Sequence, residues 1–401
     1  MAGERSVAAH AIASSLLAQL PVRHGFGDAT LVRHREGSID LGGGNPDVAS
    51  LPVALYREAA RDLTGSDGFA ASLRYAPAAG IPALRAWIAA REGVDAERVI
   101  VTTGGAHGLA LAVLGTLDAG DAIVVDDPVY PLFLRTLDLA GAQPVPVRVD
   151  AHGIDVDELE RRLIAGLRPK ALFTVPTFHN PTGGTLPEDR ARRLAELADR
   201  FGFTLILDDP YREVGFERGA VDVRSRLLDS DRVIAVNTFS KTLGPALRVG
   251  WIVVPAALAE GFVRLRNRLD GLTSGTLQEL VVRIVERPEY PRALAAAGRG
   301  YASKARELQW ALASRFGDEL EMTDPSGGFF LWARLRGEAD FARFHELAQD
   351  EGVFFQRGEW FAVDDDAHLR GAMRLSFSEQ SVERLVEGAE RLHRAWLRAR
   401  A

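Results

Sequence analysis

The sequence predicts an α/β fold in which a mostly parallel central sheet carries helices on both faces and a smaller α+β domain follows. Short, continuously apolar runs alternate with helix-like patterns through the middle of the 401-residue chain. Such runs are typical of parallel strands that are buried on both faces. A polar cluster follows each of several runs, and the pattern changes to an α+β layout after about residue 290.

Composition is that of a globular protein with a large core, and it excludes several kinds of chemistry. Hydrophobic residues make up 47% and charged residues 26% of the chain, which are ordinary values. The formal net charge of −7 argues against a nucleic-acid partner, which usually requires a basic face. The chain has no cysteine, so disulfides, Cys-ligated zinc and thiol catalysis are excluded. No apolar run reaches the roughly 18 residues of a membrane helix, and we expect a cytoplasmic protein.

The N-terminal segment, residues 1–45, is expected to pack near the small domain. Ile12, Leu16 and Leu20 recur at a spacing of four, which predicts an amphipathic helix ended by Pro21. Polar and acidic residues interrupt and precede this stretch, which argues against a secretory signal peptide.

The large domain is expected over residues 46–290. Strands that end in turns or polar clusters are predicted at 98–105, 122–130, 170–184, 203–211 and 232–241. Helices are predicted at 109–117 and 187–202, the second with proline at its start and glycine at its end. Because ligands of parallel sheets bind at the carboxyl ends of the strands, the five clusters indicate one site.

The small domain is expected over residues 291–401. Helices are predicted at 301–316 and 341–352, and strands at 327–335 and 372–378. The helical stretch 257–300 is predicted to join the two domains.

The stretch TTGGAHG at 102–108 joins the first strand to a helix. Glycines allow backbone N–H groups to approach an anion, and the helix N-terminus adds its dipole. Thr238, Ser240 and Arg248 could complete such a phosphate cradle. The alternative is a tight turn that needs glycine for a positive φ.

Three other strand ends carry candidate ligand-binding residues. Tyr130 in DDPVYP either packs with its hydroxyl satisfied or stacks on a planar ligand. Asn180 in HNPTGG suits a turn, and its amide can also donate to a ligand oxygen. Asp208 in LDDPY follows a buried strand, where a carboxylate is costly unless it is paired. A cationic ring nitrogen would be such a partner, and the adjacent Asp209 is expected to face elsewhere.

Lys241 lies in NTFSKTLGPALRVG, just after an apolar strand. A lysine is usually exposed, but a desolvated amine near Arg248 would have a lowered pKa and be nucleophilic toward aldehydes. A Schiff-base lysine, an acidic partner for a pyridine nitrogen and a phosphate cradle together describe a pyridoxal 5'-phosphate (PLP) site.

Nine motifs in order resemble those of the PLP-dependent class I/II aminotransferases, which have the aspartate aminotransferase fold (fold type I). They are GGGNPD, RYAPAAGIPALR, TTGGAHGLAL, DDPVYP, FHNPTGG, LDDPY, TFSKTLGPALRVGW, DPSGGFFLW and MRLSFS. The resemblance covers nearly the whole chain, and the aminoadipate/kynurenine aminotransferase-like branch is the most similar in pattern. It implies a PLP enzyme that moves an amino group between an L-amino acid and a 2-oxo acid by a ping-pong mechanism.

The resemblance also implies roles for individual residues toward the cofactor. Lys241 would form the Schiff base and move the proton, and Asp208 would keep the pyridine nitrogen protonated. Tyr211 and Asn180 would donate to the phenolic oxygen, and Tyr130 would stack on the ring. The phosphate would be bound by Gly105, Ala106, Thr238, Ser240 and Arg248.

Substrate and partner contacts are implied in the same way. Arg374 resembles the arginine that binds the α-carboxylate in a bidentate pair, with Gly44 and Asn180 beside it. Tyr75 is similar to a tyrosine that reaches the phosphate of the neighbouring subunit, which implies a homodimer with shared sites.

The sequence departs from the family pattern in two places. Many relatives carry polar Gln-type residues at 106–107, where this chain has Ala106 and His107. His107 either contacts the phosphate or ring edge or caps the helix. Arg357 stands where relatives usually carry proline, and it either binds an acidic substrate side chain or is solvated.

Two other functions are compatible with this fold, because a fold does not fix a reaction. One is a PLP-dependent lyase, cyclase, decarboxylase or oxidase that uses the same residues. The other is the sensor domain of a transcription regulator, which the short stretch before DLGGGNP and the acidic net charge both disfavour.

Overall fold

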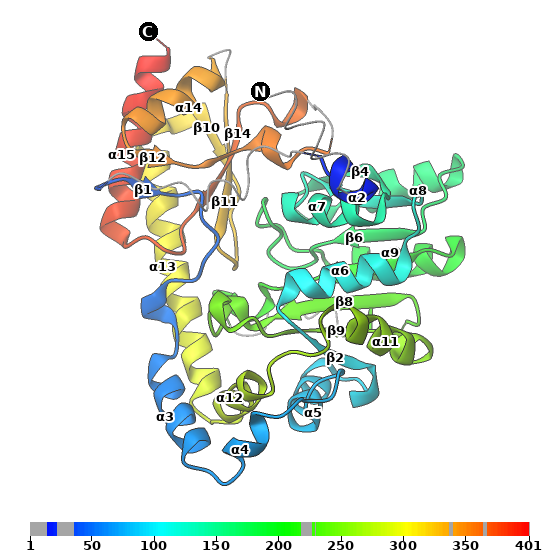
Figure 1. Ribbon diagram of the computed structural model, residues 1–401. Helices are drawn as coiled ribbons and strands as arrows, with labels where there is room; N and C mark the ends of the chain where they lie inside the picture. Colours follow the sequence, from blue (N-terminus) through cyan, green and yellow to red (C-terminus); the bar gives the residue numbers. More distant parts are fainter. Residues whose placement is uncertain are drawn as a thin grey trace, which may run out of the picture.

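A large sheet and a small sheet, connected by a long helix, organise the chain (Figure 1). The computed structural model describes residues 14–21, 36–217, 227–228, 230–336, 340–363 and 367–400.

In the described part of the chain, the large sheet has eight strands in the order β2-β9-β8-β7-β6-β3-β4-β5. Their bounds are Val99–Thr102 (β2), Ala122–Asp127 (β3), Gln143–Asp150 (β4), Gly153–Ile154 (β5), Ala171–Thr174 (β6), Thr204–Asp208 (β7), Val233–Thr238 (β8) and Gly250–Val253 (β9). Strands β8, β7, β6, β3 and β4 pair in parallel, whereas β9 runs antiparallel to both its neighbours and β5 to β4. The expected mostly parallel sheet is confirmed.

Helices cover both faces of this sheet because its central strands are apolar on both sides. Leu205 and Leu207 of β7 lie in one hydrophobic core and Ile206 lies in the other. The first core includes side chains of α5 (Pro82–Glu92), α8 (Val156–Ile164), α9 (Glu188–Phe201) and α12 (Gly275–Val285). The second includes side chains of α6 (Gly105–Thr116), α7 (Pro131–Ala140) and α11 (Ala259–Asp270). Alternate residues of one strand thus face opposite helical layers.

The small sheet is antiparallel, in the order β10-β11-β14-β13. Its strands are Leu320–Met322 (β10), Phe330–Leu335 (β11), Gln356–Arg357 (β13) and Ala372–Ser376 (β14). Helices α13 (Tyr290–Phe316), α14 (Phe341–Asp350) and α15 (Val382–Ala399) share its hydrophobic core. The α+β layout expected after residue 290 is present, while the boundaries near residues 45 and 290 stay a prediction.

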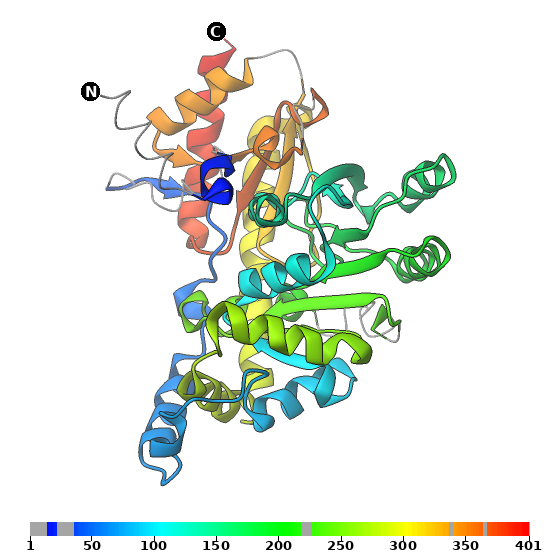
Figure 2. The same ribbon diagram turned by 45° about the vertical axis from the view of Figure 1, so that its right-hand side comes forward.

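The start of the described chain joins the small sheet region. Strand β1 (Ile39–Asp40) pairs in parallel with β12 (Val353–Phe354), and β1 lies beside the C-terminal elements in both views (Figures 1 and 2). Helices α3 (Val53–Thr64) and α4 (Phe69–Ser72) follow. Of the predicted N-terminal helix, the structure describes α2 (Ser15–Gln19), which ends just before Pro21, and residues 1–13 lie outside the described residues. Among the described residues, no helix combines the length and apolarity needed to cross a bilayer.

The stretch 257–300, predicted as a helical connection between the domains, is mostly helical but is not one continuous helix. It contains α11, α12 and the first part of α13. Helix α11 ends at Asp270 and is followed by Gly271. The φ of Gly271 is +77°, a backbone conformation that residues with a side chain rarely adopt. The turn from Asp270 to Ser274 follows this break, and its side chains contact Thr103 and Arg266 near the site described below.

Two glycines of α13, Gly298 and Gly300, provide a test of how this helix packs. The Cβ of a Gly298→Ala variant would overlap the carbonyl oxygen of Gly215, whereas a Cβ at Gly300 has no atom within 4 Å. We expect Gly298→Ala to lower the free energy of unfolding by about 1–3 kcal/mol and Gly300→Ala to raise it by up to about 1 kcal/mol. Urea unfolding of both variants measures this, and a change of the same sign in both would contradict the packing.

Candidate active site

The carboxyl ends of the central parallel strands bring the predicted residues together. Asp208 ends β7, and Lys241 closes the short 3₁₀ helix Phe239–Lys241 that follows β8. These two strands are hydrogen-bonded neighbours. Asn180 follows β6, the next strand of the sheet.

The Lys241 amine is held inside this cluster. Its Nζ donates to the carbonyl oxygen of Gly44 at 2.7 Å and lies 5.5 Å from the ring centroid of Tyr211. Burial, and then the charge of Arg374, lower the pKa of Lys241 to about 8, while Asp208 and Glu379 oppose the shift. An amine with this pKa is partly uncharged near neutral pH.

Arg374 lies in the centre of β14 and is fully buried. Its Nη1 donates to Asn180 Oδ1 at 2.8 Å and its Nη2 to the Gly42 carbonyl at 2.6 Å. The guanidinium stacks 3.9 Å from the ring centroid of Phe330. Burial lowers the pKa of Arg374 to about 10, so the group stays charged at neutral pH. Both acceptors are neutral, so they orient the guanidinium without cancelling its charge.

Two tyrosines line the same cluster. Tyr211 is buried and packs edge-on against Phe329 and Phe330, with centroids 5.6 and 5.7 Å away. Burial, and then Tyr130, raise the pKa of the Tyr211 phenol, and a hydrogen bond with Asn180 opposes this. Burial, and then Asp208, likewise raise the pKa of Tyr130. Both phenols therefore remain protonated and can donate a hydrogen bond.

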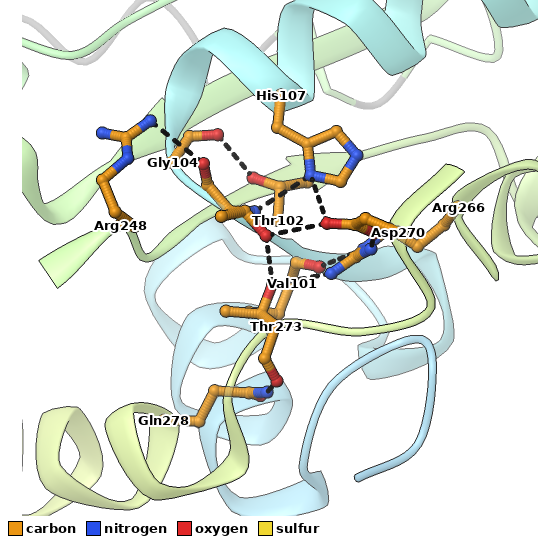
Figure 3. Close-up of polar contacts among 10 residues, drawn as sticks. Val101, Thr102, Gly104, His107, Arg248, Arg266, Asp270, Thr273 and Gln278 are labelled. Atoms are coloured by element: carbon orange, nitrogen blue, oxygen red, sulfur yellow. Dashed lines mark hydrogen bonds and ion pairs between the residues drawn. The ribbon is translucent and has the colours of Figure 1, made fainter. Parts of the chain in front are cut away.

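The turn between β2 and α6 faces Arg248 (Figure 3). It also lies beside the hydroxyl-bearing residues Thr238, which ends β8, and Ser240. The Nη2 of Arg248 donates to Thr103 O at 3.1 Å, and a Cβ on Gly104 would lie 2.6 Å from that nitrogen. A Cβ on Gly105 would lie 3.5 Å from Thr238, whose Oγ1 is 2.8 Å from Ser240 Oγ. In the described structure the N–H groups of Gly105 and Ala106, at the start of α6, have no acceptor. Orphan donors beside an arginine and two hydroxyls suit a phosphate group.

Tyr75 is the one predicted site residue that does not join the cluster within the described part of a single chain. Its side chain is 97% exposed, in the segment between α4 and α5.

The register of the small sheet bears on Arg357. Gln356 pairs with Arg374, and Arg357 pairs with Met373, so Arg357 points to the other face from Arg374. There it binds Glu359 at 3.1 Å and lies 5.8 Å from the Phe341 centroid. This geometry accounts for Arg357 without a substrate.

Sequence reasoning missed two residues that border the cluster. Gln356 Nε2 donates to the Gly42 carbonyl at 3.4 Å, the oxygen that also accepts from Arg374. Glu379 lies 3.4 Å from Asn45 Nδ2 and packs against Gly43, and burial raises its pKa. Gln356 lies on a two-residue strand and Glu379 in the bend after β14, where no periodic pattern singles out one side chain. Asp209 faces away toward Arg212, as expected, with 3.9 Å between the charged groups.

Comparison with known proteins shows which protein family has this arrangement. The family Aminotransferase class I and II matches residues 36–392. The chain belongs to that family.

Individual relatives agree with the family match. A 2-aminoadipate transaminase of Thermus thermophilus is 30% identical over 90% of this chain and 90% of its own length. A solved kynurenine aminotransferase of Pyrococcus horikoshii, in complex with PMP, has a TM-score of 0.90 at 27% identity over 97% of this chain and 98% of its own. The alpha-aminoadipate aminotransferase LysN of T. thermophilus, complexed with N-(5'-phosphopyridoxyl)-L-leucine, has a TM-score of 0.84 at 29% identity, over 98% and 96%.

This aminotransferase therefore has the fold type I architecture and uses PLP to move an amino group between an amino acid and a 2-oxo acid. The relatives support this prediction over the lyase, cyclase, decarboxylase or oxidase alternative. The residues at the strand ends fit the cofactor, because a partly uncharged amine, a buried carboxylate and orphan N–H donors lie at one sheet edge.

The lowered pKa of Lys241 can be measured directly in the apoprotein, because the chain has only three lysines, Lys170, Lys241 and Lys304. We expect the rate of acylation of Lys241, measured by mass spectrometry at a series of pH values, to be half its maximum near pH 8. The reason is that only the free amine reacts. In the urea-unfolded chain the midpoint should return toward 10.5.

An Arg374→Met variant is the matched control, because it removes the charge that lowers this pKa. Its folded apoprotein should label Lys241 with a midpoint above pH 8. The same midpoint in folded and unfolded wild type would contradict the described environment of the amine.

Proposed function

We propose that Lys241 is the residue that condenses with PLP and moves the proton during transamination. The observation that carries this proposal is its amine, of pKa about 8, in one cluster with Asp208 and Arg374. When bound, PLP supplies an aldehyde that condenses with amines and a ring that accepts the electron pair released at the substrate α-carbon. Lys241 can take up and return a proton near neutral pH because its pKa lies close to that pH. The hydrogen bond to Gly44 orients its amine.

The remaining cofactor contacts are proposed from their place around Lys241. Asp208 would hold the protonated ring nitrogen, since it is a buried carboxylate at the end of β7. Tyr211 and Asn180, which are hydrogen-bonded to each other, would donate to the phenolic oxygen. Tyr130 would pack against the ring.

The phosphate cradle is proposed to consist of Gly105, Ala106, Thr238, Ser240 and Arg248. The two backbone N–H groups and the α6 dipole favour an anion. Arg248 adds the charge, and the paired hydroxyls of Thr238 and Ser240 add further donors.

Arg374 is proposed to bind the substrate α-carboxylate, with Asn180 and the turn at Gly44 beside it. Its guanidinium is already oriented by Asn180 and Gly42, so binding costs less ordering of the side chain. We propose that the amino donors are amino acids with long side chains. This proposal rests on the relatives, which are named for 2-aminoadipate and kynurenine.

We propose a homodimer with shared sites because of the position of Tyr75. A tyrosine side chain that is 97% exposed, close to Leu73 at 66%, suits an interface. Tyr75 would reach the phosphate of the partner subunit. We also propose a cytoplasmic enzyme without a nucleic-acid partner, in keeping with its net charge of −7.

An amino-donor screen tests the function. We expect 2-aminoadipate, kynurenine or an aromatic amino acid to yield a new amino acid from 2-oxoglutarate or pyruvate, and Lys241→Ala to abolish this. That variant should lose the absorbance band of lysine-linked cofactor yet still bind PLP through the phosphate cradle. A cofactor spectral shift without any amino acid product would contradict transamination.

Mixed dimers test the shared site. Lys241→Ala and Tyr75→Ala homodimers should each be nearly inactive. When equal amounts of the two chains are mixed, a heterodimer has one site with both defects and one with neither. Activity should therefore recover to about a quarter of wild type. No recovery, with heterodimers demonstrated by differential tags, would overturn the role of Tyr75.

A further inference from the structure

A polar cluster lies beneath the start of α6, on the side of the β2–α6 turn away from Arg248 (Figure 3). Its charged members are Arg266 and Asp270 of α11, and His107 of α6 joins them. The proposed chemistry of the site uses none of the three. Arg266 is fully buried, and an arginine is rarely buried without a specific pairing.

Asp270 is the centre of this cluster. Its Oδ1 forms an ion pair with Arg266 Nη1, and its Oδ2 accepts from Thr103 Oγ1 at 3.0 Å. Oδ2 also lies 3.5 Å from His107 Nδ1. One carboxylate thus connects the buried guanidinium to the turn that precedes α6.

Arg266 connects that carboxylate to the sheet and to the next turn. Its Nε donates to the Val101 carbonyl of β2 at 3.3 Å, and its Nη2 donates to Thr273 Oγ1 at 2.8 Å. Gln278 in turn donates to the Thr273 carbonyl at 2.7 Å. The guanidinium is therefore fixed from three directions.

His107 acts as an acceptor in the cluster. Its Nδ1 accepts from the N–H of Thr103 at 3.1 Å. Burial, and then the charges of Arg266 and Arg248, lower the pKa of His107 to about 4, so the ring is neutral at physiological pH and Nδ1 keeps its lone pair.

Thr103 is consequently held at each of its polar groups. Its N–H donates to His107, its hydroxyl donates to Asp270, and its carbonyl accepts from Arg248. The turn is fixed by Arg248 on one side and by the Arg266 cluster on the other. The orphan N–H groups of Gly105 and Ala106 come directly after it.

We propose that Arg266, acting through Asp270, and His107 are positioning residues for the cofactor phosphate, because both hold Thr103 of the β2–α6 turn. The cluster fixes the direction of the first N–H groups of α6, and a preorganised donor set binds an anion more tightly. The inference rests on the proposed phosphate cradle and adds a second layer of residues to it.

Affinities of the apoprotein test this inference. We expect Arg266→Met to weaken binding of both PLP and inorganic phosphate by about tenfold. Binding of pyridoxal, which lacks the phosphate, should be unchanged. A loss shared equally by pyridoxal would show a general disturbance of the site and overturn the proposal.

Two controls separate positioning from stability. Val281→Ala removes volume from a fully buried position of α12, so it should destabilise the protein yet bind PLP as wild type does. His107→Gln keeps an acceptor for Thr103 N–H and should retain phosphate affinity, whereas His107→Leu should lose it.

The His107 pair keeps the proposal testable if Arg266→Met does not fold. Wild-type affinity for PLP in Arg266→Met, or in His107→Leu if Arg266→Met does not fold, would overturn it. Failure of the wild type itself to bind PLP would instead count against the proposed function.

Discussion

The site depends on holding a lysine amine and an arginine guanidinium in one buried cluster. Two cations repel each other, and burial disfavours the charged form of the amine. Burial, and then the charge that Arg374 keeps at neutral pH, lower the pKa of Lys241 to about 8. The carboxylates of Asp208 and Glu379 limit the shift. The amine is therefore reactive near neutral pH because of the groups around it, and each of those groups comes from a different element.

The 42–44 backbone is where these elements meet. The Gly42 carbonyl accepts from Arg374 and Gln356 of the small sheet, and the Gly44 carbonyl accepts from Lys241 after β8. A Cβ on Gly44 would lie 3.3 Å from the Phe330 ring, so a larger residue there would crowd the ring on which the Arg374 guanidinium stacks. A short stretch without side chains thus lets both cationic groups approach the same backbone.

The fold and most of the site could be predicted from sequence because both follow strong local signals. Buried parallel strands are continuous apolar runs, and their ends locate Asp208, Asn180 and Lys241. The positions of Gln356 and Arg357 could not be predicted, since one residue of register decides which of them faces Arg374. The Arg266–Asp270 pair had no signal either, because arginine and aspartate four residues apart on a helix are usually an exposed pair. Only the tertiary packing of α11 against β2 buries Arg266, while Asp270 stays partly accessible to solvent. Tyr75 stays a prediction, because its place depends on a second chain.

The pairing of β1 with β12 has a consequence for the folding of the chain during its synthesis. Ile39 is matched with Val353, and Arg374 reaches back to Gly42, so two segments that lie far apart in the sequence close the candidate active site together. While the protein emerges from the ribosome, the eight-stranded sheet can form long before this closure is possible. The nascent protein would then contain a folded sheet but stay inactive until the segment with β12 and β14 has also been released.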